Sequence, residues 1–241
     1  VFSGGFWGEK KSDIYRLLPD GSYPEWAPVS EYTPFMKERS FPVVVKPDCG
    51  ERGIGVKIIE TEETFSDYAK QSGDSIVQAF VPVQEYGVFY VRFPHEAQGQ
   101  ILSITHKVLP ELLGDGQSDI ETLCLSHPYA VYLLPAYRRM DESTRQQILA
   151  EGEVFRPVSI GTHSMGAVFC DGNRFRSAQL TRYFDTVTAK AEGLYFGRFD
   201  VKVSSAADLK QAHGIQILEF NGVTGESGHI YDPSYNLWGA Y

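Results

Sequence analysis

The chain has 241 residues, of which 42% are hydrophobic and 22% are charged, and its formal net charge is −9. This composition is that of an ordinary globular protein with a sizeable core, and the negative charge argues against a broad nucleic-acid-binding surface, which needs clustered lysine and arginine. No apolar run approaches the length of a membrane span and no signal peptide opens the chain, so we expect neither nucleic acid nor a membrane among its partners.

The cysteines indicate a reducing environment. Cys49, Cys124 and Cys170 are odd in number and far apart, so neither a disulfide framework nor a cysteine metal site is expected. We therefore expect a cytoplasmic protein. The chain runs from Val1 to Tyr241 without a natural-looking end at either side, and we expect it to be a piece of a longer protein with a domain upstream.

Helices and strands are mixed along the chain without strict alternation. Amphipathic or capped segments predict helices over 12–18, 31–38, 62–71, 141–151 and 177–192. Apolar or alternating segments predict strands over 42–46, 75–80, 87–93, 100–108, 196–203 and 215–220. The strands 87–93 and 100–108 have hairpin character, and Ser118 to Glu121 matches a helix capping box. This mixture favours an α+β fold over a doubly wound sheet.

The strand 42–46 ends on Lys46 and is followed by a loop with three glycines, 50–55. A lysine at the end of a buried strand faces a cleft, and a loop with few side chains lets backbone N–H groups approach an anion. The order of residues excludes a Walker loop, whose lysine directly follows its last glycine, and a protein-kinase loop, which precedes its strand lysine. Phosphate binding and a hairpin whose glycines merely permit a turn both remain open.

Carboxylates gather in the last two predicted strands. Alternation along 196–203 puts Arg198, Asp200 and Lys202 on one face, and Glu219 and Asn221 are two residues apart, so they share a face as well. One Asp, one Glu and one Asn are oxygen ligands that suit Mg²⁺, whereas zinc ligands at suitable spacing are absent. A pair of solvent-exposed strand ends is the alternative.

Other polar residues each carry two interpretations. The segment from Gln78 to Val81 offers backbone groups to a purine edge and Glu85 could accept from ribose hydroxyls, or Glu85 is a surface residue beside a loop. His229 acts as an acid, a base or a hydrogen-bond donor to substrate. Alternatively, the polar groups of its loop satisfy one another. Four basic residues either hold anions or are ordinary surface charges: Arg92, Lys107, Arg176 and Arg182.

Taken in this order, these elements resemble the ATP-grasp superfamily from about Lys11 to Asn221. The segment LLGDGQSDIETL is similar to one in the peptide-ligase branch that includes cyanophycin synthetase and bacterial glutathione synthesis, with D-alanine–D-alanine ligase more distant. The ending LEFNGVTGESGHIYDP looks closest to a group of uncharacterised ATP-grasp proteins.

The resemblance implies an α+β ATP-grasp fold in which two lobes grip a nucleotide, with most of the N-terminal substrate domain missing. We expect a remnant of, or link to, that domain over 1–24, a small lobe with a glycine-rich lid over 25–82, and a C-terminal lobe with the metal site over 83–241. Gln78 departs from the pattern, because many members have Glu there.

The resemblance also implies roles for individual residues. Nucleotide-binding residues are Lys11, Lys46, Arg52, Gly53, Ile54, Gly55, Gln78, Ala79, Phe80, Val81, Glu85 and Leu218. Asp200, Glu219 and Asn221 hold Mg²⁺, with Mn²⁺ as an alternative. Catalytic candidates are Lys107, Arg182, Arg198 and His229, and further substrate contacts are Arg92, His163 and Tyr231.

The implied activity is that of an ADP-forming carbon–nitrogen ligase. ATP activates a small-molecule carboxylate as an acyl phosphate, which an amine then attacks. Two alternatives stay open, a nucleotide-binding module without turnover and a kinase that only transfers phosphate. A homodimer is left open as well.

Overall fold

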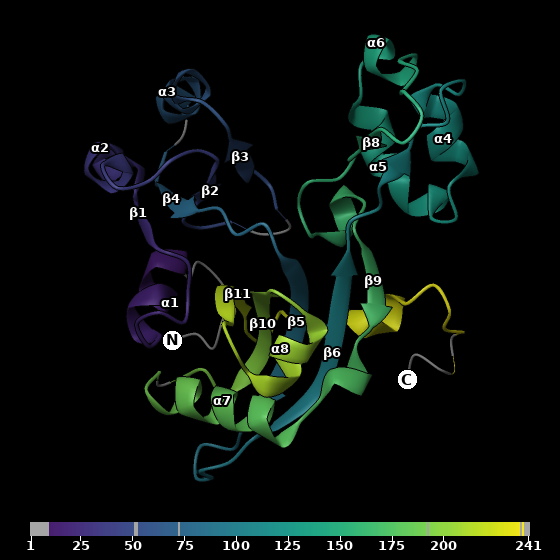
Figure 1. Ribbon diagram of the computed structural model, residues 1–241. Helices are drawn as coiled ribbons and strands as arrows, with labels where there is room; N and C mark the ends of the chain where they lie inside the picture. Colours follow the sequence, from purple (N-terminus) through teal and green to yellow (C-terminus); the bar gives the residue numbers. More distant parts are fainter. Residues whose placement is uncertain (1–9, 51–52, 72, 192, 237, 239–241) are drawn as a thin grey trace.

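The computed structural model describes residues 10–50, 53–71, 73–191, 193–236 and 238, and these form two lobes and an inserted helical segment (Figure 1). The α+β class is confirmed. Every strand pair is antiparallel, in sheets of four, five and two strands. Among the described residues, no helix is both long enough and apolar enough to cross a membrane.

The small lobe is a four-stranded sheet in the order β1-β4-β2-β3. Its strands are β1 (Trp26–Pro28), β2 (Val43–Pro47), β3 (Lys57–Ile59) and β4 (Ser75–Ala79). The sheet packs against α2 (Tyr32–Met36) and α3 (Glu62–Gln71), and Val43, Val45 and Val77 are almost fully buried in the core between them. β2 lies inside the sheet, which explains its run of β-branched residues.

The large lobe is a five-stranded sheet in the order β11-β10-β5-β6-β9. Its strands are β5 (Gln84–Val91), β6 (Gln100–Val108), β9 (Val168–Asp171), β10 (Phe196–Val203) and β11 (Gln216–Asn221). The predicted hairpin is confirmed as β5 and β6. The two sheets join through the linker 80–83, between β4 and β5.

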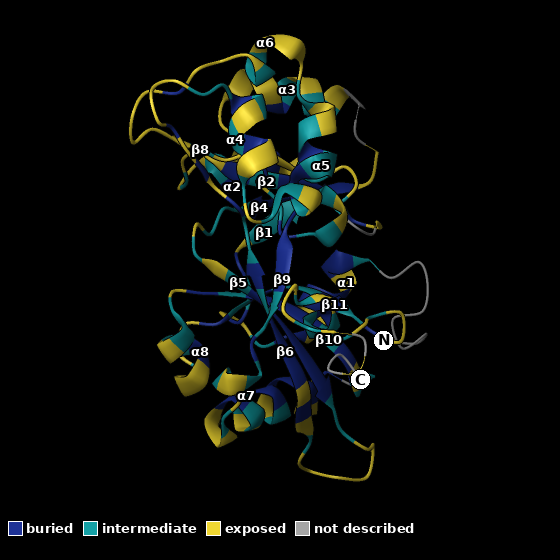
Figure 2. Ribbon diagram, turned by 90° about the vertical axis from the view of Figure 1, so that its right-hand side faces the viewer, coloured by how far each residue is buried: buried dark blue, intermediate teal, exposed yellow. Residues whose placement is uncertain are grey.

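Two helices cover one face of the large sheet. α7 (Ala178–Ala189) and α8 (Ala206–Gln211) lie on the face that carries Phe199, Val201 and Val203, all of them buried (Figure 2). α1 (Lys11–Leu17) adds Tyr15 to the same core. The alternation predicted for 196–203 therefore holds, and the polar residues of β10 are left on the face without these helices.

The inserted segment lies between β6 and β9 and has a core of its own. It contains β7 (Leu112–Leu113), α4 (Ile120–Ser126), α5 (Ala130–Arg139), α6 (Glu142–Arg145) and β8 (Val154–Phe155). Figure 1 places it across from the small lobe, above β6 and β9.

Two local predictions in the inserted segment were wrong. The helix expected over 141–151 is only the single turn of α6, because Gln147 O and Leu149 O accept hydrogen bonds from Ile120 and Gly116 instead of continuing a helix. The N-cap of α4 is Asp119, which accepts from Thr122 N at 2.8 Å, and not the first residue of the predicted capping box. α5, which contains Pro135, was not predicted.

Candidate functional site

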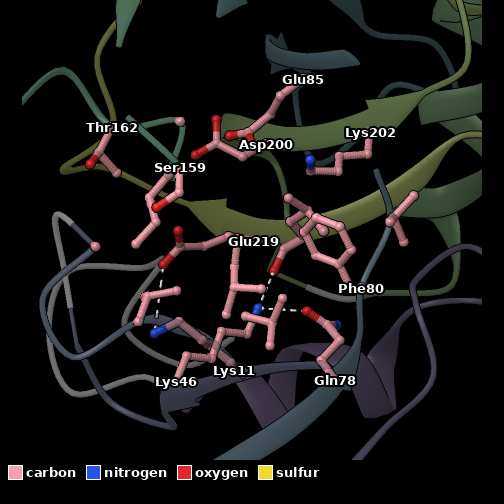
Figure 3. Close-up of a pocket in the computed structure, with 18 of the residues that line it drawn as sticks. Lys11, Lys46, Gln78, Phe80, Glu85, Ser159, Thr162, Asp200, Lys202 and Glu219 are labelled. Atoms are coloured by element: carbon pink, nitrogen blue, oxygen red, sulfur yellow. Dashed lines mark hydrogen bonds and ion pairs between the residues drawn. The ribbon is translucent and has the colours of Figure 1, made fainter. Parts of the chain in front are cut away.

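A cavity lies between the lobes, where β2 and β4 face the side of the large sheet that lacks α7 and α8 (Figure 3). Many of the residues predicted from the sequence line this cavity. They are Lys11, Lys46, Gly53, Ile54, Gln78, Ala79, Phe80, Val81, Glu85, Lys107, Asp200, Leu218 and Glu219. They come from elements far apart in the sequence, so the fold brings these predicted residues together.

Lys46 forms the floor of the cavity on the small-lobe side. It is only 6% exposed, and its ammonium donates to Tyr15 Oη at 2.9 Å, Gln78 Oε1 at 2.8 Å and the Leu218 carbonyl at 3.1 Å. All three acceptors are neutral, so burial dominates and lowers the pKa of Lys46 to about 8. Since these acceptors are neutral, the ammonium of Lys46 is available to an incoming anion.

The glycine loop follows β2 directly and turns back toward β3. Gly53 and Gly55 have φ values of +73° and +75°, a conformation that strains any residue with a Cβ. At Gly55 a Cβ would also lie 2.7 Å from Pro47 Cγ. Gly53 and Ile54 line the cavity, whereas Gly55 is not among the lining residues and Arg52 lies outside the described residues. The glycines are therefore needed for the path of this loop.

Lys11 reaches the cavity from α1. Its ammonium donates to the Gly50 carbonyl at 2.9 Å and lies 3.7 Å from Glu219 Oε1. The start of α1 is held by the buried Asp48, which accepts from Ser12 N at 2.8 Å and from Ser12 Oγ at 2.6 Å. Lys11 thus links the glycine loop to the carboxylate of β11.

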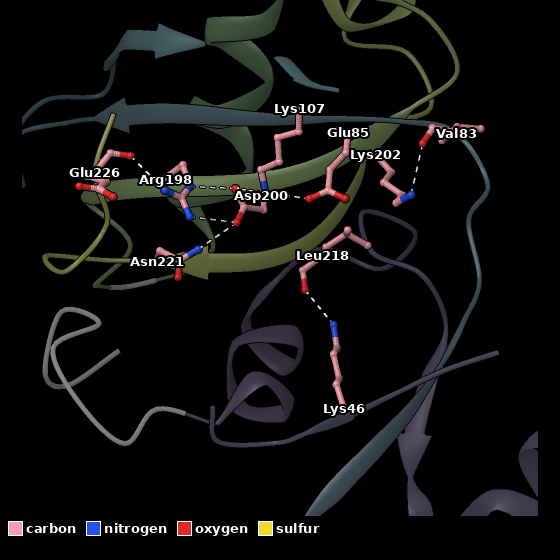
Figure 4. A network of polar contacts seen from close by, with 10 residues as sticks. All are labelled: Lys46, Val83, Glu85, Lys107, Arg198, Asp200, Lys202, Leu218, Asn221 and Glu226. Atoms are coloured by element: carbon pink, nitrogen blue, oxygen red, sulfur yellow. Dashed lines mark hydrogen bonds and ion pairs between the residues drawn. The ribbon is translucent and has the colours of Figure 1, made fainter. Parts of the chain in front are cut away.

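The open face of the large sheet carries charges in register (Figure 4). Lys202, Glu85 and Lys107 are direct neighbours on β10, β5 and β6, and Asp200 lies opposite Glu219. Lys107 Nζ lies 2.7 Å from Glu85 Oε1 and 3.1 Å from Asp200 Oδ1. The side chains alternate along each strand, so these charged side chains all lie on the same face of the sheet.

Asp200 is held by cations despite its burial. Arg198 donates to Asp200 Oδ1 at 2.8 Å and to Oδ2 at 3.2 Å, and Asn221 Nδ2 donates to Oδ2 at 3.1 Å. Burial alone raises the pKa of Asp200, but Arg198 and Lys107 outweigh it, so the pKa lies below its ordinary value. The Arg198 side chain crosses Gly87, where a Cβ would lie 2.9 Å from Arg198 Cδ.

The residues proposed for Mg²⁺ satisfy a chemical test of fit. Asp200 and Glu219 are register partners on antiparallel strands, and Asn221 is bonded to Asp200. In the described part of the chain no three His, Cys, Asp or Glu side chains cluster as a ready-made metal site. Two carboxylates and an amide suit Mg²⁺, which completes its shell with water and phosphate oxygens.

The other end of the cavity is more apolar. The linker residues Ala79, Phe80 and Val81 lie there beside Gln78 and Leu218. Lys202 donates to the Val83 carbonyl at 3.2 Å, close to the Phe80 ring, and burial lowers the pKa of Lys202. A flat apolar group with polar edges would fit against this linker.

One wall of the cavity was not predicted. The loop 159–162, which follows β8, contributes Ser159, Ile160, Gly161 and Thr162. A Cβ on Gly161 would lie 2.6 Å from the Glu85 carboxylate, so any larger residue would displace that carboxylate. The sequence signal was the GTHSMG segment, in which only His163 was noted. Lys202 also lines the cavity, although it was only assigned to a face.

Several candidate residues are not among those lining the cavity. Arg182 is on α7, which covers the opposite face of the large sheet, so its predicted catalytic role is not supported. Arg92 donates to Thr188 and to Glu96 O, near the other end of β5.

The tail residues lie beside the site rather than in it. His229 and Tyr231 belong to the 3-10 turn η4 (Gly228–Tyr231), which packs on β6 and β9. Burial lowers the pKa of His229, and its Nδ1 has no hydrogen-bond partner among the residues that the structure describes. The rings of Tyr231 and His163 stack with centroids 5.0 Å apart. Arg198 joins the tail to the site, because it donates to the Glu226 carbonyl at 3.1 Å.

Comparison with known proteins gives short matches in sequence and long ones in structure. No family model matches the chain. The glutathione biosynthesis bifunctional protein GshAB of Streptococcus mutans is 29% identical over 89 residues, which are 34% of this chain and 11% of that protein. GshAB of Streptococcus thermophilus is 25% identical over 128 residues, 47% of this chain and 16% of that protein. The chain therefore spans a small part of the curated relatives it matches.

Two solved structures share the fold. D-alanine–D-alanine ligase from Bacillus anthracis aligns with a TM-score of 0.52 at 13% identity, over 91% of this chain and 57% of that one. The ATP-grasp ligase PsnB, solved in complex with a minimal precursor, aligns with a TM-score of 0.51 at 12% identity. The alignment covers 95% of this chain and 57% of that one. The expected resemblance to ATP-grasp proteins is thus confirmed at the level of the fold.

Proposed function

We propose that this chain, which has the ATP-grasp fold, is the nucleotide-binding part of an ATP- and Mg²⁺-dependent carboxylate–amine ligase. One observation carries the proposal. In a protein of net charge −9, four lysines line the cavity, Lys11, Lys46, Lys107 and Lys202, against three carboxylates. Arg198, which forms an ion pair with Asp200, brings a further positive charge close to the cavity. An excess of buried positive charge in an acidic protein fits a polyanionic ligand such as a nucleoside triphosphate.

The two ends of the cavity suggest how the nucleotide is oriented. The base fits the apolar end, between the linker residues that follow Gln78 and the side chain of Leu218. Glu85 lies between the ends and is a candidate for the ribose hydroxyls. The phosphates then reach Lys46, Lys11 and the N–H groups of the glycine loop.

Asp200, Glu219 and Asn221 are the residues that would hold Mg²⁺. When bound there, Mg²⁺ supplies positive charge to the phosphate oxygens. Lys107 and Arg198 neutralise the same region and fix the position of Asp200 through direct hydrogen bonds. The protein's contribution is therefore positioning and charge neutralisation, which is what phosphoryl transfer requires.

The proposed reaction has two steps. A carboxylate oxygen of the first substrate bonds to the γ-phosphorus as the bond to ADP breaks, which gives an acyl phosphate. The nitrogen of an amine then bonds to the acyl carbon, phosphate leaves, and the amine loses a proton. The glycine loop and the loop 159–162 both line the cavity and approach each other closely, so together they would exclude water, which hydrolyses acyl phosphates.

Calorimetric titration tests the nucleotide site. We expect ATP to bind wild-type protein with Mg²⁺ and to bind more weakly with EDTA. Lys46→Met, which keeps the buried stem, should lose at least about tenfold in affinity because a charged hydrogen bond contributes roughly 1.5–3 kcal/mol. Lys70→Ala is the matched control, since the Lys70 side chain is 72% exposed on α3. Equal loss in both variants would refute the assignment of Lys46.

A second assay tests the chemistry. ADP release is measured with a panel of carboxylates, with and without amines. Release that needs both substrates supports ligation, whereas release with a carboxylate alone and a stable phosphorylated product supports a kinase. Glu219→Gln should abolish Mg²⁺-dependent turnover, and unchanged turnover would refute the metal assignment.

A further inference from the structure

The loop 159–162 touches the glycine loop from the opposite side of the cavity. A Cβ on Gly53 would lie 3.1 Å from both Thr162 Oγ1 and Thr162 Cγ2, and 3.4 Å from Ile160 Cγ2. On its other side the loop rests on the Glu85 carboxylate through Gly161. The position of Thr162 is therefore fixed by both lobes.

The hydroxyl of Thr162, unlike its backbone groups, has no hydrogen-bond partner in the described part of the chain. Its N–H donates to Ile160 O at 2.8 Å, and its carbonyl accepts from Met165 N at 3.0 Å and from Ala167 N at 3.2 Å. Oγ1 is buried, and none of the described residues forms a hydrogen bond with it. Leaving a buried hydroxyl unpaired is unfavourable, so such an atom at a cavity wall indicates a missing partner.

The surroundings of Thr162 indicate which part of a ligand supplies that partner. Figure 3 shows Thr162 and Ser159 on the side of the cavity where Asp200 and Glu219 lie, away from Phe80 and Gln78. The residues of the apolar end are therefore distant from this hydroxyl. The glycine loop, which it touches, is the element suited to phosphate oxygens.

We propose that the Thr162 hydroxyl donates a hydrogen bond to an oxygen of the γ-phosphate of bound ATP. The inference rests on the proposed function and adds a binding residue to it. The inserted segment then supplies the second half of the closure over the triphosphate, with the glycine loop as the first half. Because ADP lacks the γ-phosphate, this contact discriminates between ATP and ADP.

Isosteric variants test the contact. Thr162→Val keeps the shape and removes the hydroxyl, and Thr162→Ser keeps the hydroxyl. Calorimetry with Mg²⁺ compares ADP with the non-hydrolysable analogue AMP-PNP. We expect Thr162→Val to weaken AMP-PNP by about tenfold, as for one hydrogen bond to a charged group, and to leave ADP within about twofold of wild type. Thr162→Ser should retain wild-type affinity for both.

Stability of the free protein separates a ligand contact from a structural role. Removing a hydroxyl that has no partner should leave the unfolding midpoint unchanged or raise it, whereas loss of a structural hydrogen bond would lower it. An unchanged AMP-PNP to ADP ratio in Thr162→Val, or equal weakening of both ligands, overturns the inference while the nucleotide site stands. Wild-type protein that binds neither nucleotide overturns the inference and the proposed function together.

Discussion

The ion pair between Lys107 and Glu85 is expected to stabilise the fold far more than a surface pair of the same length. Lys107 Nζ lies 2.7 Å from Glu85 Oε1, with side-chain exposures of 3% and 15%. Arg156 Nε lies 2.7 Å from Glu111 Oε1 as well, but these side chains are 63% and 49% exposed. The two pairs therefore differ in solvation, and Lys107 has Asp200 as a second partner at 3.1 Å.

Solvation decides the magnitude. At about 3 Å two unit charges attract by roughly 5–6 kcal/mol at an effective dielectric constant near 20, but by only about 1.4 kcal/mol in water. Desolvation opposes the attraction in the buried pair. Burial alone lowers the pKa of Lys107, yet Asp200 and Glu85 outweigh it and raise the pKa, so the Lys107 ammonium keeps its charge. Removing one partner of such a pair leaves an uncompensated buried charge.

We therefore expect Lys107→Met to lower the free energy of unfolding by about 3 kcal/mol, the low end for a buried pair, because Glu85 borders the cavity and can be hydrated. The double variant Glu85→Gln/Lys107→Met should be about 2 kcal/mol more stable than the sum of the single effects predicts. The same cycle on Arg156 and Glu111 should give a coupling below about 0.5 kcal/mol.

Urea unfolding at pH 7, followed by circular dichroism, measures all members of both cycles. The slope of the transition must stay constant for the midpoints to report stability. If the coupling of the buried pair is no larger than that of the surface pair, burial does not set the strength of this interaction, and the electrostatic reasoning for the cavity fails with it.

Three further outcomes are expected. The pKa of Lys46 falls from 10.5 to about 8 on folding, so at this residue the unfolded chain binds more protons between these values. Lys46 should therefore contribute a rise in the free energy of unfolding with pH across this window, by up to about 3 kcal/mol. In pH-dependent urea titrations Lys46→Met should remove this contribution and leave that of Lys202, whose pKa is also lowered by burial. Gly55→Ala should weaken nucleotide binding and lower the unfolding midpoint, because its φ is +75° and its Cβ would collide with Pro47; wild-type behaviour would contradict the loop geometry. Ile104→Ala should lower the free energy of unfolding by about 2–5 kcal/mol in thermal or urea unfolding, since the side chain is fully buried in the core of the large lobe.

Local features of the site were readable from the sequence. β-branched residues before Lys46 indicated a buried strand that ends at a cleft, and β2 is such a strand. Alternation in β10 separated Phe199 from Asp200 correctly, because side chains on a strand alternate whatever its partners are. The glycines after Lys46 indicated a tight loop, and Gly53 and Gly55 have the positive φ that requires them.

Other features depended on which segments meet in space. Nothing near Lys107 in the sequence shows that it lies between Glu85 and Asp200, because that arrangement follows from the order of β10, β5 and β6 in the sheet. Arg182 has the same chemistry as Arg198, yet its helix packs on the opposite face. The side of a sheet that a helix covers is a property of the whole fold.

The sequence by itself determined the chemical types at the site, a strand-end lysine, a glycine loop and late carboxylates, because each depends on neighbours along the chain. The tertiary structure alone decided that the inserted segment returns the loop 159–162 to the cavity, where Thr162 touches Gly53. These residues are more than a hundred positions apart in the sequence. Their contact is specified by the packing of two lobes and an insertion, and local propensities carry no information about it.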